Sequence, residues 1–432
     1  MKHFDKSEYL EQDEFLNTLK EYEEARKNGR DIYLDVDVLA NISNYYETHD
    51  NSLAAIDTIE YAIRLFPGDV YPLVFRARMA ILIEDDIEKA KKYLKSVIDK
   101  HDIEYYYAIA EVKIAEGHPE LASKYLKHKA EDIDEDDTES YIVEVATLFA
   151  DYNEFVIAKK WIDISNNPDD PDYWQIKGLI ELGLGNLKES ESIYNSLLDK
   201  DPYSTEYWNQ LASAQLLNFN FNDCVSSSEF SLAINPDDTD AILNKSNGLF
   251  GLANFEESLK YSKRYTEICP DEYSGNMLQG MALSNLERYE EAIDAFNKAL
   301  EKCPDNDPAK NEIYEELTNA LSLTDKFDEA IKIADYCYRN NGGIEAIINK
   351  GNLYLQHGDM ANARDTFEIA LKESNNDSET YIRISASLMD NGYVEMAYKI
   401  LHCMLNHKEA QSDKLYVFLA ACCKILGYDD EF

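Results

Sequence analysis

Glycine, proline and long hydrophobic runs are all scarce in this sequence. Its 432 residues include 16 Gly and 10 Pro, few enough to leave long uninterrupted elements between them. No stretch approaches the roughly 18 uncharged apolar residues that a membrane-spanning helix needs. The N-terminal residues 1–15 also lack the apolar core of a secretory signal. We therefore expect no membrane insertion, and we expect the protein to be cytoplasmic.

Basic residues are few compared with acidic ones. The chain has 42 Lys and Arg against 84 Asp and Glu, a formal net charge of −42. A surface of this sign repels phosphate backbones and anionic membrane surfaces, so nucleic acid is not expected as a partner. The hydrophobic content of 45% is ordinary for a globular protein and argues against wholesale disorder.

Motifs that carry chemistry are missing. The sequence has no Gly-rich phosphate loop, no HExxH, no GxSxG and no CxxC. Its seven cysteines are an odd number without a short-range framework, which is typical of free thiols in a reducing compartment. His402, Cys403 and His407 come closest to a ligand cluster, but their spacing matches no zinc motif. We expect no catalytic residues, no metal and no cofactor, and hence a protein that is not an enzyme.

A period of 34 residues runs through the middle of the chain. Trp174 and Trp208 are 34 residues apart, and so are Cys269 and Cys303. Four prolines follow one another at the same step: Pro202, Pro236, Pro270 and Pro304. A fixed period of this length is the signature of a repeat architecture.

Each period contains two amphipathic helices and a turn. In residues 172–202 an apolar stripe at helical spacing is interrupted at residues 183–186, and a second stripe follows. Proline is tolerated at a helix start but costs about 3 kcal/mol inside a helix. All ten prolines fall at the boundaries of this pattern, which therefore predicts a chain of helix–turn–helix units.

The unit resembles the tetratricopeptide repeat, which follows W-x2-L-G-x2-Y, then A-x3-F, then P. With each unit numbered from 1, a small residue recurs at position 8, an alanine at position 20 and an aromatic residue at position 24. Position 8 holds Ala110, Ala146, Gly178, Ala212, Gly280 and Gly351. Position 20 holds Ala55, Ala90, Ala122, Ala158, Ala292, Ala330, Ala363 and Ala397. The aromatic residues at position 24 are Tyr194, Phe296 and Phe367.

The resemblance implies an all-α fold, a right-handed α-α superhelical solenoid of about eleven helix-turn-helix repeats. The units start near residues 36, 71, 103, 139, 171, 205, 239, 273, 311, 344 and 378. Residues 10–28 and 412–426 are predicted to form capping helices, because the end units of a solenoid need polar outer faces. The expected division is an N-terminal cap in residues 1–35, a solenoid in 36–411, and a C-terminal capping helix with an acidic tail in 412–432. The acidic run 131–137 is interpreted as a solvated connector.

Asparagine recurs on the face that the family uses for binding. The resemblance implies that the first helices line a concave groove, faced by positions 2, 5, 6, 9, 12 and 13. Positions 6 and 9 hold Asn44, Asn244, Asn247, Asn319, Asn349 and Asn352. An amide both donates and accepts, so it suits the backbone of an extended peptide, and asparagine is a poor helix former whose repeated use needs a reason. The alternative is that these side chains simply face solvent.

Apolar residues share this predicted face: Phe75, Met79, Tyr107, Leu179, Leu243, Phe250, Met277, Met281 and Ile348. Exposed apolar surface often marks a binding site, and methionine adapts to varied partners. The alternative is a register shifted by one residue, which would make them core residues.

Acidic residues fill position 2 in most units: Asp37, Glu104, Asp172, Glu206, Asp240, Glu312, Glu345 and Glu379. A carboxylate in the first turn is stabilised by the helix dipole by about 0.3–1 kcal/mol, which is a sufficient structural reason. Positions 5, 9, 12 and 13 carry no Lys or Arg, and position 6 carries only Arg76 and Arg383. Some relatives grip C-terminal carboxylates with Lys and Arg on this groove; here we expect no such clamp, and a neutral or basic partner.

Together these features predict a non-enzymatic protein–protein interaction scaffold. It would bind an extended peptide or a helix of a neutral or basic partner in its concave groove. The alternative is a structural or self-assembling subunit of a larger complex that uses its caps or its convex face.

Overall fold

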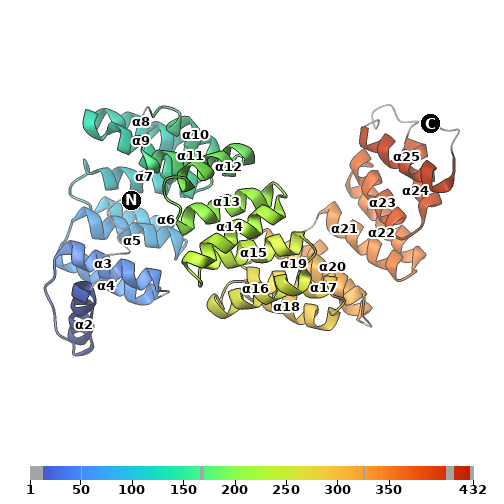
Figure 1. The fold of residues 1–432 in the computed structure, drawn as a ribbon, viewed down its shortest axis with the longest axis horizontal. Helices are drawn as coiled ribbons and strands as arrows, with labels where there is room; N and C mark the ends of the chain where they lie inside the picture. The colour runs from blue at the N-terminus through green and yellow to red at the C-terminus, as the bar shows by residue number, and fades with distance from the viewer. Residues whose placement is uncertain are drawn as a thin grey trace. The chain divides into compact units, whose positions relative to one another are not determined.

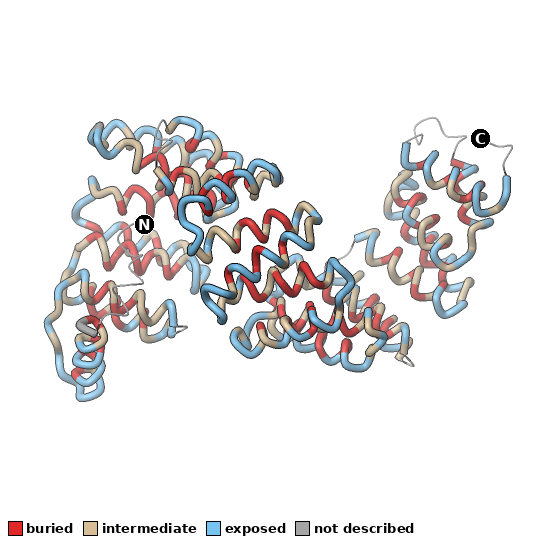
Figure 2. Tube along the Cα trace, viewed as in Figure 1, coloured by how far each residue is buried: buried red, intermediate tan, exposed pale blue. Residues whose placement is uncertain are grey.

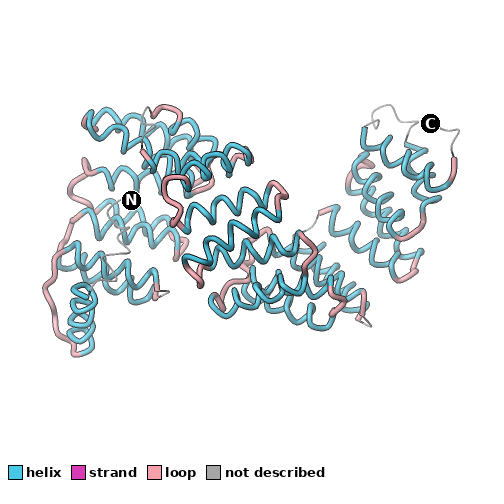
Figure 3. The backbone as a smooth tube through the Cα atoms, in the orientation of Figure 1, coloured by secondary structure: helices cyan, strands magenta, loops and turns pink. Residues whose placement is uncertain are grey.

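The described part of the chain folds into helices alone. In the computed structural model the described residues are 13–49, 51–165, 170–324, 326–341, 343–404 and 413–428. They form 24 α-helices, labelled α2 to α25, two 3₁₀ helices and no strand (Figure 1 and Figure 3). The predicted all-α repeat fold is thereby confirmed.

The chain divides into two compact units, Met1–Pro202 and Tyr203–Phe432. The first contains α2 (Asp13–Lys27), α3 (Val36–Thr48), α4 (Ser52–Leu65), α5 (Val70–Leu82), α6 (Ile87–Lys95), α7 (Ile103–Ala115), α8 (Pro119–Lys129), η1 (Ala130–Asp132), η2 (Glu135–Asp137), α9 (Thr138–Asp151), α10 (Phe155–Ile162), α11 (Pro171–Gly183) and α12 (Leu187–Leu198). The second contains α13 (Thr205–Leu217), α14 (Phe221–Ile234), α15 (Thr239–Gly251), α16 (Phe255–Ile268), α17 (Ser274–Asn285), α18 (Tyr289–Lys302), α19 (Ala309–Ser322), α20 (Phe327–Asn341), α21 (Ile344–Gln356), α22 (Met360–Glu373), α23 (Ser378–Asp390), α24 (Val394–Met404) and α25 (Asp413–Leu426).

Within each unit, every odd-numbered helix from α3 to α23 begins a repeat. It packs against the even-numbered helix that follows it and against the next odd-numbered helix. Buried positions recur along the sides of the helices that face these neighbours (Figure 2). The eleven first helices each begin within two residues of the predicted start of a unit.

Position 8 and position 24 of a repeat meet where its two helices pack. A Cβ atom added to Gly280 would lie 2.4 Å from the ring of Phe296, and one added to Gly351 would lie 2.3 Å from the ring of Phe367. Side chains in a close-packed interior do not approach so closely. Glycine therefore lets the first helix lie directly on the aromatic ring of the second.

The turn between the two helices of a repeat needs one residue in the left-handed region. Gly185 and Gly358 fill this place with φ of 78° and 76°. In other repeats Phe219, Ala253 and Glu287 fill it, with φ of 60°, 57° and 59°. The left-handed conformation costs a non-glycine residue roughly 1–2 kcal/mol. The packing of the flanking helices must therefore hold these turns.

The helices α2 and α25 lie where the two capping helices were predicted. The division into residues 1–35, 36–411 and 412–432 stays a prediction. Residues 1–12, 405–412 and 429–432, which include part of both predicted caps and the acidic tail, lie outside the described residues.

Polar side chains cap most first helices. Those whose oxygen accepts a hydrogen bond from a backbone N–H of the first turn are Asp69, Asp102, Asp170, Ser204, Asp238 and Asp377. The eight acidic residues predicted at position 2 all lie in first turns, at the positive end of the helix dipole.

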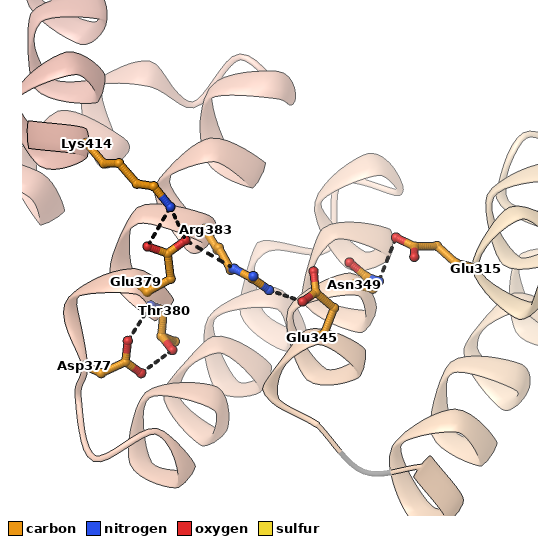
Figure 4. A network of polar contacts seen from close by, with 8 residues as sticks. All are labelled: Glu315, Glu345, Asn349, Asp377, Glu379, Thr380, Arg383 and Lys414. Carbon is orange, nitrogen blue, oxygen red and sulfur yellow. Dashed lines mark hydrogen bonds and ion pairs between the residues drawn. The ribbon is translucent and has the colours of Figure 1, made fainter. Parts of the chain in front are cut away.

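We expect Asp377→Ala to lower the free energy of unfolding by about 1 kcal/mol at pH 7, as the loss of an N-cap does. Asp377 accepts hydrogen bonds from the backbone nitrogen of Thr380 at 3.0 Å and from its Oγ1 at 2.7 Å (Figure 4). Burial acts to raise the pKa of Asp377, but these bonds outweigh it and hold the pKa below its usual value.

A depressed carboxyl pKa contributes stability above the unfolded-state pKa of about 3.9. This stability is lost as the pH falls through the folded-state value. Urea unfolding followed by circular dichroism should therefore show that the difference in free energy of unfolding between wild type and Asp377→Ala becomes smaller as the pH drops below about 3.9. A gap of the same size at acid and neutral pH would contradict the assignment.

Candidate functional site

The predicted binding residues occur in both compact units. Asn44 is half-buried on α3, and Phe75 and Tyr107 lie on α5 and α7, so all three belong to the first unit. The other eight belong to the second unit, on α15, α17, α19 and α21.

Phe75 and Tyr107 do not present the exposed apolar surface that was expected. They are 7% and 3% exposed, and Met79 is buried beside Phe75 in the same core cluster. The ring of Tyr107 stacks on Tyr141 at 5.9 Å, and its hydroxyl donates to Oε2 of Glu144 at 2.7 Å. For these residues the structure supports the alternative, a place in the core.

Asn244 and Asn247 make their contacts within the protein. Nδ2 of Asn244 donates to Oγ of Ser213 at 3.1 Å and to the carbonyl of Asn209 at 3.3 Å, which links α15 to α13. Nδ2 of Asn247 donates to the carbonyl of Leu243 in its own helix, at 3.0 Å. Both side chains are half-buried, and one of them joins neighbouring first helices.

Phe250, Met277 and Met281 are half-buried and pack against the core of the repeats around α17 to α20. Phe250 lies 5.3 Å from the ring of Phe255, at a steep angle. These side chains cover the core, and part of each remains accessible.

Asn319, Asn349 and Asn352 come together at one cavity. It has a volume of about 280 Å³ and lies among α19, α20 and α21. Its lining comprises Asn311, Tyr314, Glu315, Thr318, Asn319, Ala334, Cys337, Gly343, Glu345, Ala346, Asn349, Asn352 and Leu353. The lining combines three predicted amides with an aromatic ring, aliphatic side chains and two carboxylates.

Two amides in the cavity each use one of their two polar atoms in a hydrogen bond within the protein. Nδ2 of Asn349 donates to Oε1 of Glu315 at 2.9 Å (Figure 4). Oδ1 of Asn352 accepts from Nδ2 of Asn391 at 2.7 Å. Among the described residues, Oδ1 of Asn349, Nδ2 of Asn352 and the amide of Asn319 have no hydrogen-bond partner. One acceptor, one donor and one complete amide are thus left for a ligand.

A row of alternating charges continues from this cavity along α21, α23 and α25. Arg383 pairs with Glu345, and its Nε lies 3.7 Å from Oε1 of Glu379 (Figure 4). Nζ of Lys414 lies 3.2 Å from the same carboxylate. Arg383, one of the two basic residues at position 6, is therefore engaged by two acidic residues.

Arg76, the other basic residue at position 6, is 1% exposed. Its Nε lies 3.0 Å from Oε1 of Glu60, and its Nη2 lies 2.7 Å from Oε1 of Glu84. Both arginines at position 6 are thus paired with carboxylates of the chain itself.

Three carboxylates on α19 are not compensated in this way. In the described part of the chain, Glu312, Glu315 and Glu316 form no ion pair. Burial raises the pKa of Glu316, and the charges of Glu315 and Glu312 raise it further. The α19 side of the cavity is therefore the more negative one.

Sequence reasoning missed Tyr314, Glu315 and Cys337 as residues of the site. Glu315 stands at position 5, a groove position, and a survey of every residue at such positions would have found it. Tyr314 fills the tryptophan position, and Cys337 lies on a second helix, so no positional rule indicated either residue.

Other predicted features concern membranes, metals and thiols. None of the described helices is long and apolar enough to span a membrane. The described residues contain no group of three or more His, Cys, Asp or Glu side chains that could hold a metal ion, and His407 lies outside them. All seven cysteines are free thiols, and Cys403 is exposed.

Comparison with known proteins gives two matches to family models, both described as tetratricopeptide repeat. They cover residues 277–306 and 344–377. No curated protein matches the sequence.

Several solved structures are similar. A tetratricopeptide repeat protein of Parabacteroides merdae is 15% identical with a TM-score of 0.45, over 58% of this chain and 98% of that one. A thermophilic protein of the same kind from Thermus thermophilus is 16% identical with a TM-score of 0.36, over 43% of this chain and all of that one. The two family matches fall on α17 to α18 and on α21 to α22, inside a run of eleven helix pairs with the expected period. The chain is therefore a tetratricopeptide-repeat protein.

Proposed function

We propose that this protein is a non-enzymatic scaffold that binds an extended segment of a neutral or basic partner protein along first helices of its second unit, centred on the cavity at α19, α20 and α21. Tetratricopeptide repeats indicate a role in protein–protein interaction or scaffolding. The proposal adds where on the chain the partner binds, that the bound segment is extended, and that the partner is neutral or basic.

The cavity with its three asparagines is the observation that carries the proposal. A peptide backbone presents one N–H and one C=O per residue. The unused Oδ1 of Asn349 and Nδ2 of Asn352 can accept and donate one hydrogen bond each. Tyr314 and Leu353 add apolar surface to the lining, of the kind that ligand pockets combine with a few polar groups. An extended segment could therefore pair its backbone with the amides and place a side chain in the cavity.

The charges near the cavity support a neutral or basic partner. The lining contains Glu315 and Glu345, and no Lys, Arg or His among its described residues. The chain as a whole carries a formal charge of −42. An acidic segment would meet like charge at close range, which costs affinity and slows association.

A structural or self-assembling role through the ends of the chain is the second candidate. On α25, the last described helix, Val417 and Ile425 are 66% and 62% exposed. The end helix of a solenoid is expected to have a polar outer face instead. Exposed apolar side chains on a terminal helix are compatible with contact to another molecule.

We expect the double substitution Asn319→Ala and Asn352→Ala to reduce recovery of the partner by about tenfold. Loss of one or two hydrogen bonds at a desolvated site is worth on the order of 1–3 kcal/mol, and 1.4 kcal/mol is tenfold in affinity. Asn349 is left intact because it also holds Glu315. Asn352 is bonded to Asn391 in turn, so Asn391→Ala, which removes that bond and leaves the cavity amide in place, is measured beside the double variant. The measurement is affinity capture from an extract of the native cell with quantitative mass spectrometry. A photo-crosslinking amino acid at position 346, on the cavity wall, must join the same partner.

The matched control is Asn195→Ala with Asn297→Ala, two exposed asparagines on second helices. Both variants must keep the wild-type circular dichroism spectrum and melting midpoint. Equal recovery with wild type and with the cavity variant would refute the proposal. In that case Val417→Asp with Ile425→Asp tests the second candidate, which predicts loss of a stable oligomer.

A further inference from the structure

The two carboxylates of the cavity differ in how their charge is compensated. Glu345 is paired with Arg383, which is also held by Glu379 (Figure 4). Glu315 has only the neutral amide of Asn349, on its Oε1. No other partner of Glu315 occurs among the described residues, so its Oε2 is unoccupied. The cavity therefore has one neutralised wall and one charged wall.

Apolar side chains from three helices line the cavity together with this charge. Tyr314 lies beside Glu315 in α19, and its ring is 5.5 Å from that of Tyr336 on α20. The lining continues with Cys337 on α20 and Leu353 on α21. An occupant must therefore bring apolar length and a positive end together, since an uncompensated carboxylate in partly apolar surroundings favours a cation.

Lysine and arginine have this combination. Their alkyl stems lie along apolar surface while the charged end reaches a polar group, and a tyrosine ring adds a favourable contact with a cation. A metal ion fits the cavity less well, because the described residues there supply two carboxylates and no histidine. An acidic side chain would be repelled by Glu315.

We infer that the cavity among α19, α20 and α21 is a specificity pocket that takes one lysine or arginine side chain of the bound segment, with its stem on Tyr314 and Leu353 and its cationic end at Glu315. The inference rests on the proposed function for the existence of a bound segment. The pocket selects the cation, and the amides of Asn349 and Asn352 hold the backbone on either side of it.

A thiol in the cavity allows the pocket to be tested without a partner. Cys337 lines the cavity, and burial raises its pKa to about 11, with a further contribution from the charge of Glu315. The full-length protein is equilibrated at pH 8.5 with three small disulfides: cystamine (cationic), 2-hydroxyethyl disulfide (neutral) and 3,3′-dithiodipropionate (anionic). The fraction of each mixed disulfide at each cysteine is measured by peptide mass spectrometry. Cys403, exposed and on α24, gives the reference preference of a thiol outside the cavity on the same chain.

We expect the ratio of cationic to anionic adduct at Cys337 to exceed that at Cys403 by about tenfold, which corresponds to 1.4 kcal/mol. Glu315→Gln, which keeps an acceptor for Asn349, should bring the ratio to within about twofold of that at Cys403. Glu301→Gln on the exposed side of α18 removes the same charge elsewhere and should leave the ratio unchanged.

The inference is overturned if Cys337 and Cys403 show the same ratio, or if Glu315→Gln keeps the wild-type ratio. Ala346→Cys, also on the cavity wall, is measured in parallel. If neither Cys337 nor the thiol at position 346 reacts with any of the three reagents, the cavity admits no such side chain, and the inference fails as well. None of these results depends on a partner, so they are independent of the capture experiment. A lost cation preference with intact asparagine-dependent capture would remove this inference and leave the proposed function.

Discussion

Arg78→Met is expected to lower the free energy of unfolding of the first unit by about 3–5 kcal/mol, the usual cost of removing one partner from a buried ion pair. Nε of Arg78 lies 2.8 Å from Oε2 of Glu111, and its Nη1 lies 3.1 Å from Oε2 of Glu104. The side chains of Glu104 and Glu111 are only 5% and 4% exposed. The variant would leave two buried carboxylates without a cation.

The pKa shifts of this cluster reflect both burial and ion pairing. Burial raises the pKa of Glu111, against the lowering effect of Arg78. Burial alone would lower the pKa of Arg78, but the charges of Glu111 and Glu104 raise it above its usual value. The guanidinium is thus the cation that faces both buried carboxylates inside the unit.

The distribution of tryptophan allows this unit to be followed in the whole chain. Trp161 and Trp174 lie in the first unit, and Trp208 lies in the second. In a Trp208→Phe background, urea unfolding followed by fluorescence reports on residues 1–202. The triple variant Arg78→Met, Glu104→Gln, Glu111→Gln should recover most of the lost stability, because no charge is then left unpaired.

An exposed pair provides the comparison. Nζ of Lys160 lies 3.4 Å from Oε1 of Glu120, with side chains 62% and 74% exposed. Lys160→Met should change the free energy of unfolding by about 0–1 kcal/mol, as exposed pairs do. A loss for Arg78→Met in that same range would show that the buried cluster does not hold the unit together.

The repeat architecture could be predicted from the sequence because each local signal agrees with the fold. The prolines, the small residue at position 8 and the alanine at position 20 mark the same helix boundaries and crossings, so every first helix begins close to its predicted start. The acidic run 131–137 was interpreted as a solvated connector; it joins α8 to α9, most of its described residues are exposed, and η1 and η2 form there. In that stretch Oδ2 of Asp132 accepts hydrogen bonds from Lys129 and from Tyr106. The bond to Tyr106, which lies on another helix, cannot be predicted from a local sequence pattern.

The candidate site could be predicted only in part. Asn319, Asn349 and Asn352 were placed on one face by their positions in the repeat, and the structure brings them to one cavity. Phe75 and Tyr107 were placed on the same face and are buried. Apolar spacing within one helix is the same whether the stripe meets the second helix or the groove. Only the contacts between repeats decide which of the two surfaces a residue meets. Such contacts join residues far apart in the sequence, as the hydrogen bond between Asn352 and Asn391, 39 residues apart, does.

The contact between position 8 and position 24 predicts a large, non-additive effect in the second unit. Phe296 is fully buried, and Phe296→Ala should lower the free energy of unfolding by about 3–5 kcal/mol. Gly280→Ala adds a Cβ atom that would lie 2.4 Å from the same ring. Overpacking of this kind costs about 1–3 kcal/mol, although alanine in a helix interior is otherwise favoured over glycine by about 1 kcal/mol.

In the double variant the added methyl group occupies space that the ring has left. The loss in free energy of unfolding of the double variant should therefore be smaller than the sum of the losses of the two single variants, by about 1 kcal/mol or more. Gly351→Ala combined with Phe296→Ala is the matched control, because a Cβ atom at Gly351 meets Phe367 instead. That pair should be additive within about 0.5 kcal/mol. Urea unfolding followed by circular dichroism gives the energies, and hydrogen exchange in peptides from α17 and α18 shows where the protein loosens. Additivity of Gly280→Ala with Phe296→Ala would mean that the helices separate to admit the methyl group. The glycine at position 8 would then not be what sets their spacing.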